Sequence, residues 1–166
     1  MNFSIRPTTL ADNDAIEPIL KASYSTLLQG FYDADTLARA VPIMSKAQPD
    51  LLTSGTYYAA TIDEKIVACG GWTLAVPGTK KVQDASIAHI RHVATHPDHL
   101  RKGLAKAIMT HCFDAAQAIG VTQFSCFSSL AAVAFYESVG FRAGEQKTVS
   151  FAPDLPFPMV VMTRDL

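Results

Sequence analysis

The stretch His96–Ala105, HPDHLRKGLA, decides the fold class of this chain. The residue pattern of 86–95 predicts a β-strand, which ends at the dipeptide His96-Pro97. After the stretch, apolar residues recur at helical spacing from Leu104 to Ile119. The stretch therefore joins the end of a strand to the start of a long helix.

The same stretch has the features of an anion-binding turn. A helix start presents unpaired backbone N–H groups and the positive end of the helix dipole. Gly103 lets a ligand approach the backbone, Ala105 is small, and Arg101 and Lys102 add positive charge. These features favour a pyrophosphate site, with a solvated basic connection as the alternative. The turn is not a Walker A loop, because Lys102 precedes Gly103, and the three glycines of a dinucleotide fingerprint are absent.

The rest of the pattern predicts a single α/β domain over residues 1–166. Helices are expected after residue 12, within 33–52 with a break at Pro42, and over 130–139. The expected strands are residues 3–6, 56–62, 66–74, 86–95, 123–127, 141–151 and 159–163. The order β-α-α-β-β-β-α-β-α-β-β implies a mixed, mostly antiparallel sheet with helices on both faces.

The composition excludes several classes of function. Lys and Arg total 14 and Asp and Glu total 15, which gives a net charge of −1, while 49% of the residues are hydrophobic and 17% are charged. This balance excludes intrinsic disorder. It also argues against a nucleic-acid partner, because there is no basic excess to neutralise phosphates. So little charge on an apolar chain favours self-association, and we expect a homodimer.

The cysteines and the chain start indicate a cytoplasmic protein. Cys69, Cys112 and Cys126 are too few and too scattered for a disulfide framework, and their apolar neighbours predict buried thiols. No apolar run approaches the roughly 20 residues of a membrane span. Residues 1–7 contain no apolar signal core. No membrane partner is expected.

Three segments together resemble the GNAT-type N-acetyltransferases, which use acetyl-CoA. The family pattern Arg/Gln-x-x-Gly-x-Gly/Ala is matched at Gly103 and Ala105, but its first position is Leu100. Residues 132–141, AVAFYESVGF, resemble a later family motif that carries a tyrosine near the cofactor sulfur, and residues 88–97 resemble the strand before the turn. Ser129 stands where many members have Asn, which is a second departure.

The resemblance implies transfer of an acetyl group from acetyl-CoA to a primary amine by direct attack, with no metal. It places the cofactor where the strands at 86–95 and 123–127 splay apart, and it makes Tyr136 the proton donor to the CoA sulfur. The backbone of Val93–Thr95 would bind the pantetheine arm, and the turn 100–105 the pyrophosphate. The implied cofactor-binding residues are Val93, Ala94, Thr95, Leu100, Arg101, Lys102, Gly103, Leu104, Ala105, Ser129 and Tyr136.

His89 is a candidate for the general base, since it occupies a strand position where family members often carry a catalytic Glu. A neutral imidazole, with a pKa near 6.5 in model peptides, suits an amine base. His92 or a chain of water molecules are the alternatives. Strand alternation places His89, Arg91 and Val93 on one face, with Ile90 and His92 on the other, although a bulge near Val93 would break that rule.

Two further chemistries are disfavoured. The close spacing of four histidines resembles a metal site, but His89 and His92 lie on opposite faces of the predicted strand, and no Cys or carboxylate cluster completes a zinc shell. The four histidines are His89, His92, His96 and His99. A Cys–His nucleophile is also disfavoured, and Cys126 is its best candidate.

The acceptor pocket is expected in the first half of the chain, which matches the family less closely. Its candidate lining residues are Tyr24, Leu28, Phe31, Tyr32 and Trp72. The low charge favours a small or apolar amine, because a basic protein tail would need an acidic groove. A non-catalytic CoA-binding sensor of the same fold and an interaction domain without a cofactor are the competing functions.

Overall fold

Seven strands form one sheet in the computed structural model of the chain, which describes residues 2–166. The strands are β1 (Ser4–Pro7), β2 (Tyr57–Ile62), β3 (Lys65–Thr73), β4 (Ile87–Thr95), β5 (Gln123–Ser129), β6 (Arg142–Ala152) and β7 (Leu155–Asp165). The helices are α1 (Asn13–Leu27), α2 (Ala34–Met44), α3 (Pro49–Leu52), α4 (Leu104–Gln117) and α5 (Val133–Ser138), with short 3₁₀ turns η1 (Leu10–Asp12) and η2 (Pro97–His99). The predicted order of elements is confirmed.

The strands follow the order β1-β2-β3-β4-β5-β7-β6, and β4 and β5 are the parallel neighbours in an otherwise antiparallel sheet. The expected mixed, mostly antiparallel sheet is therefore confirmed. β4 and β5 pair only where Ile87–His89 meet Gln123–Ser125. Beyond that point the two strands part, which leaves residues 90–95 of β4 with an unpaired edge on the side of β5.

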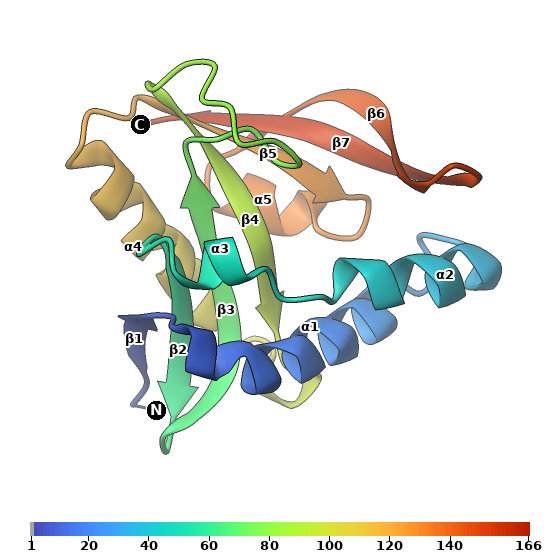
Figure 1. Cartoon of the computed structure of the whole chain (residues 1–166), viewed down its shortest axis with the longest axis horizontal. Helices are drawn as coiled ribbons and strands as arrows, with labels where there is room; N and C mark the ends of the chain where they lie inside the picture. The colour runs from blue at the N-terminus through green and yellow to red at the C-terminus, as the bar shows by residue number, and fades with distance from the viewer. Residues whose placement is uncertain (1) are drawn as a thin grey trace.

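Helices cover both faces of the sheet, as expected. On one face, Leu104, Ile108 and Cys112 of α4 are almost fully buried in the main core cluster. On the other face, Ile16 and Leu20 of α1 are equally buried in a separate cluster. Figure 1 shows α1 and α3 in front of the central strands and α4 passing behind them. Within residues 2–166, no helix combines the length and the apolar character needed to cross a membrane.

A β-bulge interrupts β4 next to the point where the strands part. His92 and Val93 of β4 together oppose the single Gly70 of β3, and His92 has a left-handed backbone with a φ of 41°. Beyond the bulge the facing of the side chains reverses. Val93 packs with Ile90 on the α4 face, and Ala94 packs on the α1 face. The expectation from simple alternation, that Val93 shares a face with His89, is therefore wrong.

Prolines mark two differences from the predicted boundaries. α2 continues through Pro42 to Met44, instead of breaking at the proline. β7 begins at Leu155, before the predicted start at Met159, although it contains Pro156 and Pro158. These prolines are tolerated because this part of β7 pairs only with β6, and β5 pairs with β7 from Met159 onward.

We expect Gly71→Ala to destabilise the fold by about 3 kcal/mol. A Cβ at this position would collide with the carbonyl oxygen of Thr56 and would lie 2.5 Å from the Cα of Tyr57, and backbone atoms cannot move aside as a side chain can. Gly55→Ala is the control: Gly55 has a left-handed φ of 78°, but an added Cβ would meet no atom within 4 Å, so we expect a loss of about 1 kcal/mol. Urea unfolding measures both, and equal losses would contradict the packing argument.

Candidate functional site

A cavity of about 520 Å³ lies where β4 and β5 part. Side chains from α1, α2, the four strands β4–β7 and α5 line it, together with the loop between β3 and β4. The lining residues are Tyr24, Met44, Gln48, Pro77, Gly78, Ile90, Arg91, His92, Val93, Phe127, Ser129, Ala132, Tyr136, Val149, Phe151 and Met159. Most of this lining is apolar or aromatic, and it contains no carboxylate.

Three side chains in the lining form a hydrogen-bonded chain. Arg91 Nη2 donates to Gln48 Oε1 at 2.9 Å, which turns the Gln48 amide nitrogen toward His92. That nitrogen lies 3.3 Å from His92 Nε2. Since an amide NH₂ can only donate, His92 Nε2 is an acceptor and the imidazole is neutral. Arg91 thus fixes Gln48, and Gln48 fixes the protonation state of His92.

Burial acts on these groups in the same direction. It lowers the pKa of His92 to about 4, with the nearby Arg91 charge adding to the effect. The pKa of His89 is also lowered, first by burial and then by Arg91. Burial lowers the pKa of Arg91 itself, although a guanidinium stays charged at any physiological pH. The cavity therefore contains one positive charge and neutral histidine.

Tyr136 reaches the same cavity from α5 and is only 6% exposed. Its ring packs edge-on against Phe135 and Phe141, with centroids 5.2 and 5.4 Å away. Burial, and then the neighbouring Cys126, raise the pKa of the phenol well above its ordinary value of 10. Tyr136 therefore keeps its proton at neutral pH and is available as a hydrogen donor.

The turn before α4 presents a row of free backbone amides. Arg101 and Gly103 both have left-handed backbones, with φ of 59° and 77°. The N–H groups of residues 101–106 make no hydrogen bond within the described part of the chain. Lys102 folds back, with its Nζ 3.3 Å from the Asp98 carbonyl oxygen, while the Arg101 side chain is exposed. Free amides at a helix start suit an anion, and so the residues present fit a pyrophosphate.

The structure gathers most of the implied cofactor contacts around the unpaired edge of β4. Val93, Ser129 and Tyr136 line the cavity, and Ala94 and Thr95 continue β4 toward the turn at 100–105. The Leu100 side chain is exposed at the position where the family carries Arg or Gln. The turn therefore offers free backbone N–H groups, and not this side chain, to an anion.

His89 does not line the cavity. It lies in the short segment where β4 still pairs with both neighbours, opposite Thr73 of β3 and Ser125 of β5. The histidine that does line the cavity is His92, because the bulge turns it toward Gln48.

Of the five residues expected to line the acceptor pocket, the structure brings only Tyr24 to the cavity. Leu28 and Trp72 are 3% and 2% exposed and belong to core clusters, because both face packed helices or strands. Phe31 is 52% exposed at the turn after α1. Tyr32 has a structural role: its hydroxyl donates to the Pro158 carbonyl oxygen at 2.7 Å and accepts from the Leu130 N–H at 2.9 Å.

The sequence argument missed most of the side chains that line the cavity. Met44 lies beyond the proline at which a helix break was expected, and Phe151 and Met159 lie on the β6–β7 pair, far along the chain. Gln48 and Arg91 had no motif to identify them. The one available signal was Arg91, a charged residue in a strand of a sheet that was expected to have helices on both faces.

The alternative chemistries find no support in the geometry. Residues 2–166 contain no group of three or more His, Cys, Asp or Glu side chains that could hold a metal ion. All three cysteines are buried, and burial raises the pKa of Cys126 to about 12, so its thiol is not a thiolate at neutral pH.

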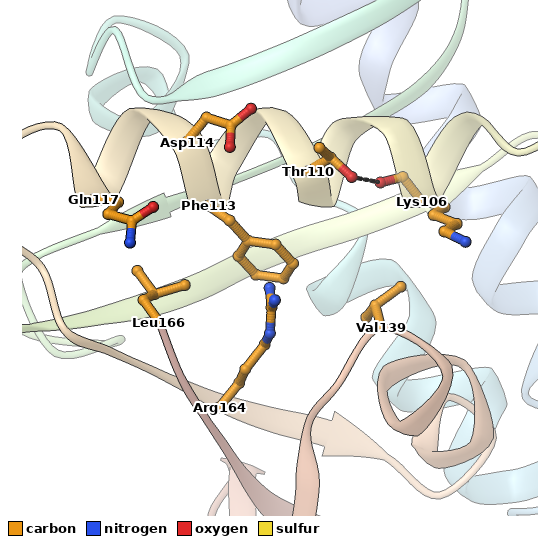
Figure 2. Close-up of a pocket in the computed structure, with 8 residues that line it drawn as sticks. All are labelled: Lys106, Thr110, Phe113, Asp114, Gln117, Val139, Arg164 and Leu166. Carbon is orange, nitrogen blue, oxygen red and sulfur yellow. Dashed lines mark hydrogen bonds between the residues drawn. The ribbon is translucent and has the colours of Figure 1, made fainter.

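A second cavity, of about 460 Å³, lies between α4 and the end of β7 (Figure 2). The Arg164 guanidinium crosses it and stacks on Phe113, with Cζ 3.8 Å from the ring centroid. Lys106, Asp114 and Gln117 lie along its α4 side. None of the residues predicted to form the site lines this cavity, and we assign the functional site to the cleft between β4 and β5.

Solved structures share this architecture. A GCN5-related N-acetyltransferase from Rhodopseudomonas palustris aligns over 100% of this chain and 97% of its own, with a TM-score of 0.77 and 18% identity. The PaiA N-acetyltransferase from Thermoplasma acidophilum, solved in complex with coenzyme A, aligns over 100% of both chains, with a TM-score of 0.75 and 12% identity. The ribosomal-protein-S18-alanine N-acetyltransferase from Escherichia coli covers 99% of this chain and 94% of its own, with a TM-score of 0.66 and 19% identity.

The chain has a mixed sheet in which β4 and β5 part, next to a helix start with free backbone N–H groups. This combination is that of the acyl-CoA-dependent N-acetyltransferases. The profile of the acetyltransferase (GNAT) domain matches residues 53–143, which is more than half of the chain. The chain belongs to the GNAT acetyltransferase family, and the resemblance seen in its motifs is confirmed. No curated protein sequence matches the chain significantly.

The low pKa of His92 predicts a loss of stability in mild acid. The folded-state pKa of about 4 lies below the ordinary value of 6.5, so this contribution is fully present above about pH 6.5 and is lost as the pH falls toward 4. We expect it to reach about 3 kcal/mol. His92→Asn removes the titrating group and keeps a residue type that tolerates positive φ.

Urea unfolding from pH 4 to pH 7 measures this effect. The variant should lose less stability than the wild type across that interval. Curves that run parallel for the two proteins would show that His92 does not titrate in this range.

Proposed function

We propose that the chain transfers an acetyl group from acetyl-CoA to the primary amine of a small-molecule acceptor. One observation carries the proposal: Tyr136 and the unpaired edge of β4 share a cavity, and β4 leads from it to the free amides before α4. A cofactor with an extended arm and a pyrophosphate needs these two features in this order. The apolar lining, which contains no carboxylate, favours a small acceptor over a basic protein tail.

Distinct groups would hold the parts of acetyl-CoA. The free amides of residues 101–106 suit the pyrophosphate, and the exposed Arg101 adds charge beside them. The unpaired backbone of residues 93–95 suits the amides of the pantetheine arm. Ser129, on the opposite strand, faces the same cavity.

When bound, acetyl-CoA supplies a thioester whose carbonyl carbon forms a bond to the amine nitrogen as its bond to sulfur breaks, and the sulfur then takes a proton. Tyr136 is placed to donate that proton. Burial raises the pKa of Tyr136, and a thiolate that departs into the same apolar cleft is also a stronger base than in water, so the phenol can protonate it.

The amine proton has no carboxylate to receive it. His92 lines the cavity, but with a pKa of about 4 it is too weak a base to hold a proton taken from an amine. His89 lies outside the lining. We therefore assign proton removal to water, with the acceptor reacting as its free base, and we expect His89→Ala to leave the pH–rate profile unchanged.

Acetyl-CoA at about 1 mM should raise the melting temperature of the protein, because a ligand stabilises the state that it binds. S-acetylpantetheine, which lacks the pyrophosphate, is the matched control and should give a smaller shift, because it leaves the amides before α4 unused. Thermal unfolding followed by circular dichroism makes the comparison. An unchanged melting temperature with acetyl-CoA would rule out a function that depends on this cofactor.

Tyr136→Phe should lower kcat by about 100-fold, the usual size of a lost proton donor, and leave the acetyl-CoA shift in melting temperature intact. Tyr58→Phe is the control, since Tyr58 is buried against α4 and does not line the cavity. Amine-dependent release of CoA thiol is the measurement. Unaffected turnover would remove Tyr136 as the donor, and cofactor binding without thiol release for any amine would instead indicate a sensor.

A further inference from the structure

We propose that Arg91 binds an anionic group of the acceptor, so that the preferred substrate is a small amine that also carries a carboxylate and an apolar side chain. This inference rests on the proposed acetyl transfer. It assigns the class of acceptor, which family membership does not define.

Arg91 is a cation without a counter-ion. Its side chain donates to two neutral oxygens, Thr73 Oγ1 at 3.2 Å and Gln48 Oε1 at 2.9 Å. It takes part in none of the ion pairs formed among residues 2–166. A half-buried guanidinium is normally paired, because removing the charge from water without compensation costs free energy. A bound carboxylate would provide that compensation, since its two oxygens match the guanidinium fork.

Arg91 lies where two cavities meet. It lines the cavity that contains Tyr136, and it also lines an adjoining cavity of about 560 Å³ beside α3 and the loop after β3. The adjoining cavity contains one carboxylate, Asp50, whose oxygen lies 3.7 Å from Lys80 Nζ. Asp50 is thus paired with another cation, and Arg91 is free to meet the ligand.

The remaining lining defines the rest of the acceptor. Tyr24, Met44, Phe127, Phe151 and Met159 present an apolar surface to the cavity that contains Tyr136. An apolar body on the acceptor would pack there while its carboxylate meets Arg91. A polyamine or a lysine-rich tail fits poorly, because its additional positive charges would face Arg91 with no carboxylate in the lining to balance them.

Matched pairs of amines test the inference directly. L-Phenylalanine is compared with 2-phenylethylamine, and L-leucine with 3-methylbutylamine, at equal concentrations of free amine base, with spermidine as a polycation. The readout is acetyl-CoA-dependent thiol release. We expect kcat/KM to be about 30-fold higher for the member that carries the carboxylate, in line with a charge-assisted pair.

Arg91→Gln should lower kcat/KM by a similar factor for the amino acids, mainly through KM, and should change it less than threefold for the simple amines. Arg142→Gln, which removes an exposed arginine that lines neither cavity, should change neither. Arg91→Lys keeps the charge without the planar fork, so its kcat/KM for the amino acids should lie between those of the wild type and of Arg91→Gln. If Arg91→Gln does not fold, the comparison of matched pairs on the wild type still decides.

Equal use of both members of a pair, or an equal loss on both in Arg91→Gln, would overturn the inference and leave acetyl transfer standing. If no amine supports thiol release, calorimetry with the CoA-loaded protein measures binding of the two amino acids instead. Failure to bind either amino acid would also overturn the inference. If acetyl-CoA does not raise the melting temperature of the protein, the proposed function itself is wrong.

Discussion

The structure depends on the short pairing between β4 and β5. β5 pairs with β7 from Gln123 to Ser129, and β4 follows β3 into the bulge at His92, so the two parallel strands meet over only three residue pairs. An unpaired strand edge inside a domain is costly unless something satisfies its N–H and C=O groups. Here the unpaired edge faces a cavity, and the same strand leads into the turn whose amides are also free. The unpaired edge of β4 and the free amides of the turn lie along one path, and so they are parts of one elongated site.

The electrostatics of that site follow from a small number of contacts. Arg91 orients Gln48, and Gln48 keeps His92 neutral, so a strand that carries an arginine and a histidine side by side contributes one charge instead of two. Tyr57, on β2, supports the same segment, because its hydroxyl donates to the His92 carbonyl oxygen at 2.8 Å. His92 is thus held by one hydrogen bond at its carbonyl oxygen and one at its ring nitrogen. A cleft that contains one fixed cation and no carboxylate favours the uncharged form of an amine.

Local pattern carried enough information to predict the elements and the turn before α4, and too little to predict most of the side chains that line the cavity. The strand, turn and helix from Ile87 to Gln117 are continuous in sequence, so their chemistry is visible in one stretch. The cavity lining joins Tyr24, Met44 and Phe151, whose proximity depends on how α1, α2 and the β6–β7 pair pack. The bulge at His92 reverses the side-chain facing within one strand; strand alternation allows a bulge near Val93 as an exception, but no residue type fixes its presence. The homodimer, inferred from composition, and the cytoplasmic location, inferred from the cysteines and the chain start, stay predictions.

Tyr32 has a consequence for how the cleft moves. Its hydroxyl joins the β7 carbonyl at Pro158 to the N–H of Leu130, and its ring stacks on Phe157 at 4.0 Å, so three separate segments of the wall are tied together. We therefore expect these segments to move together. The loop between β3 and β4 is different: residues 78–85 are exposed, and the hydrogen bonds of Val76 and Thr79 stay within the loop. Pro77 and Gly78 line the cavity, so we expect movement of this loop to change access to it.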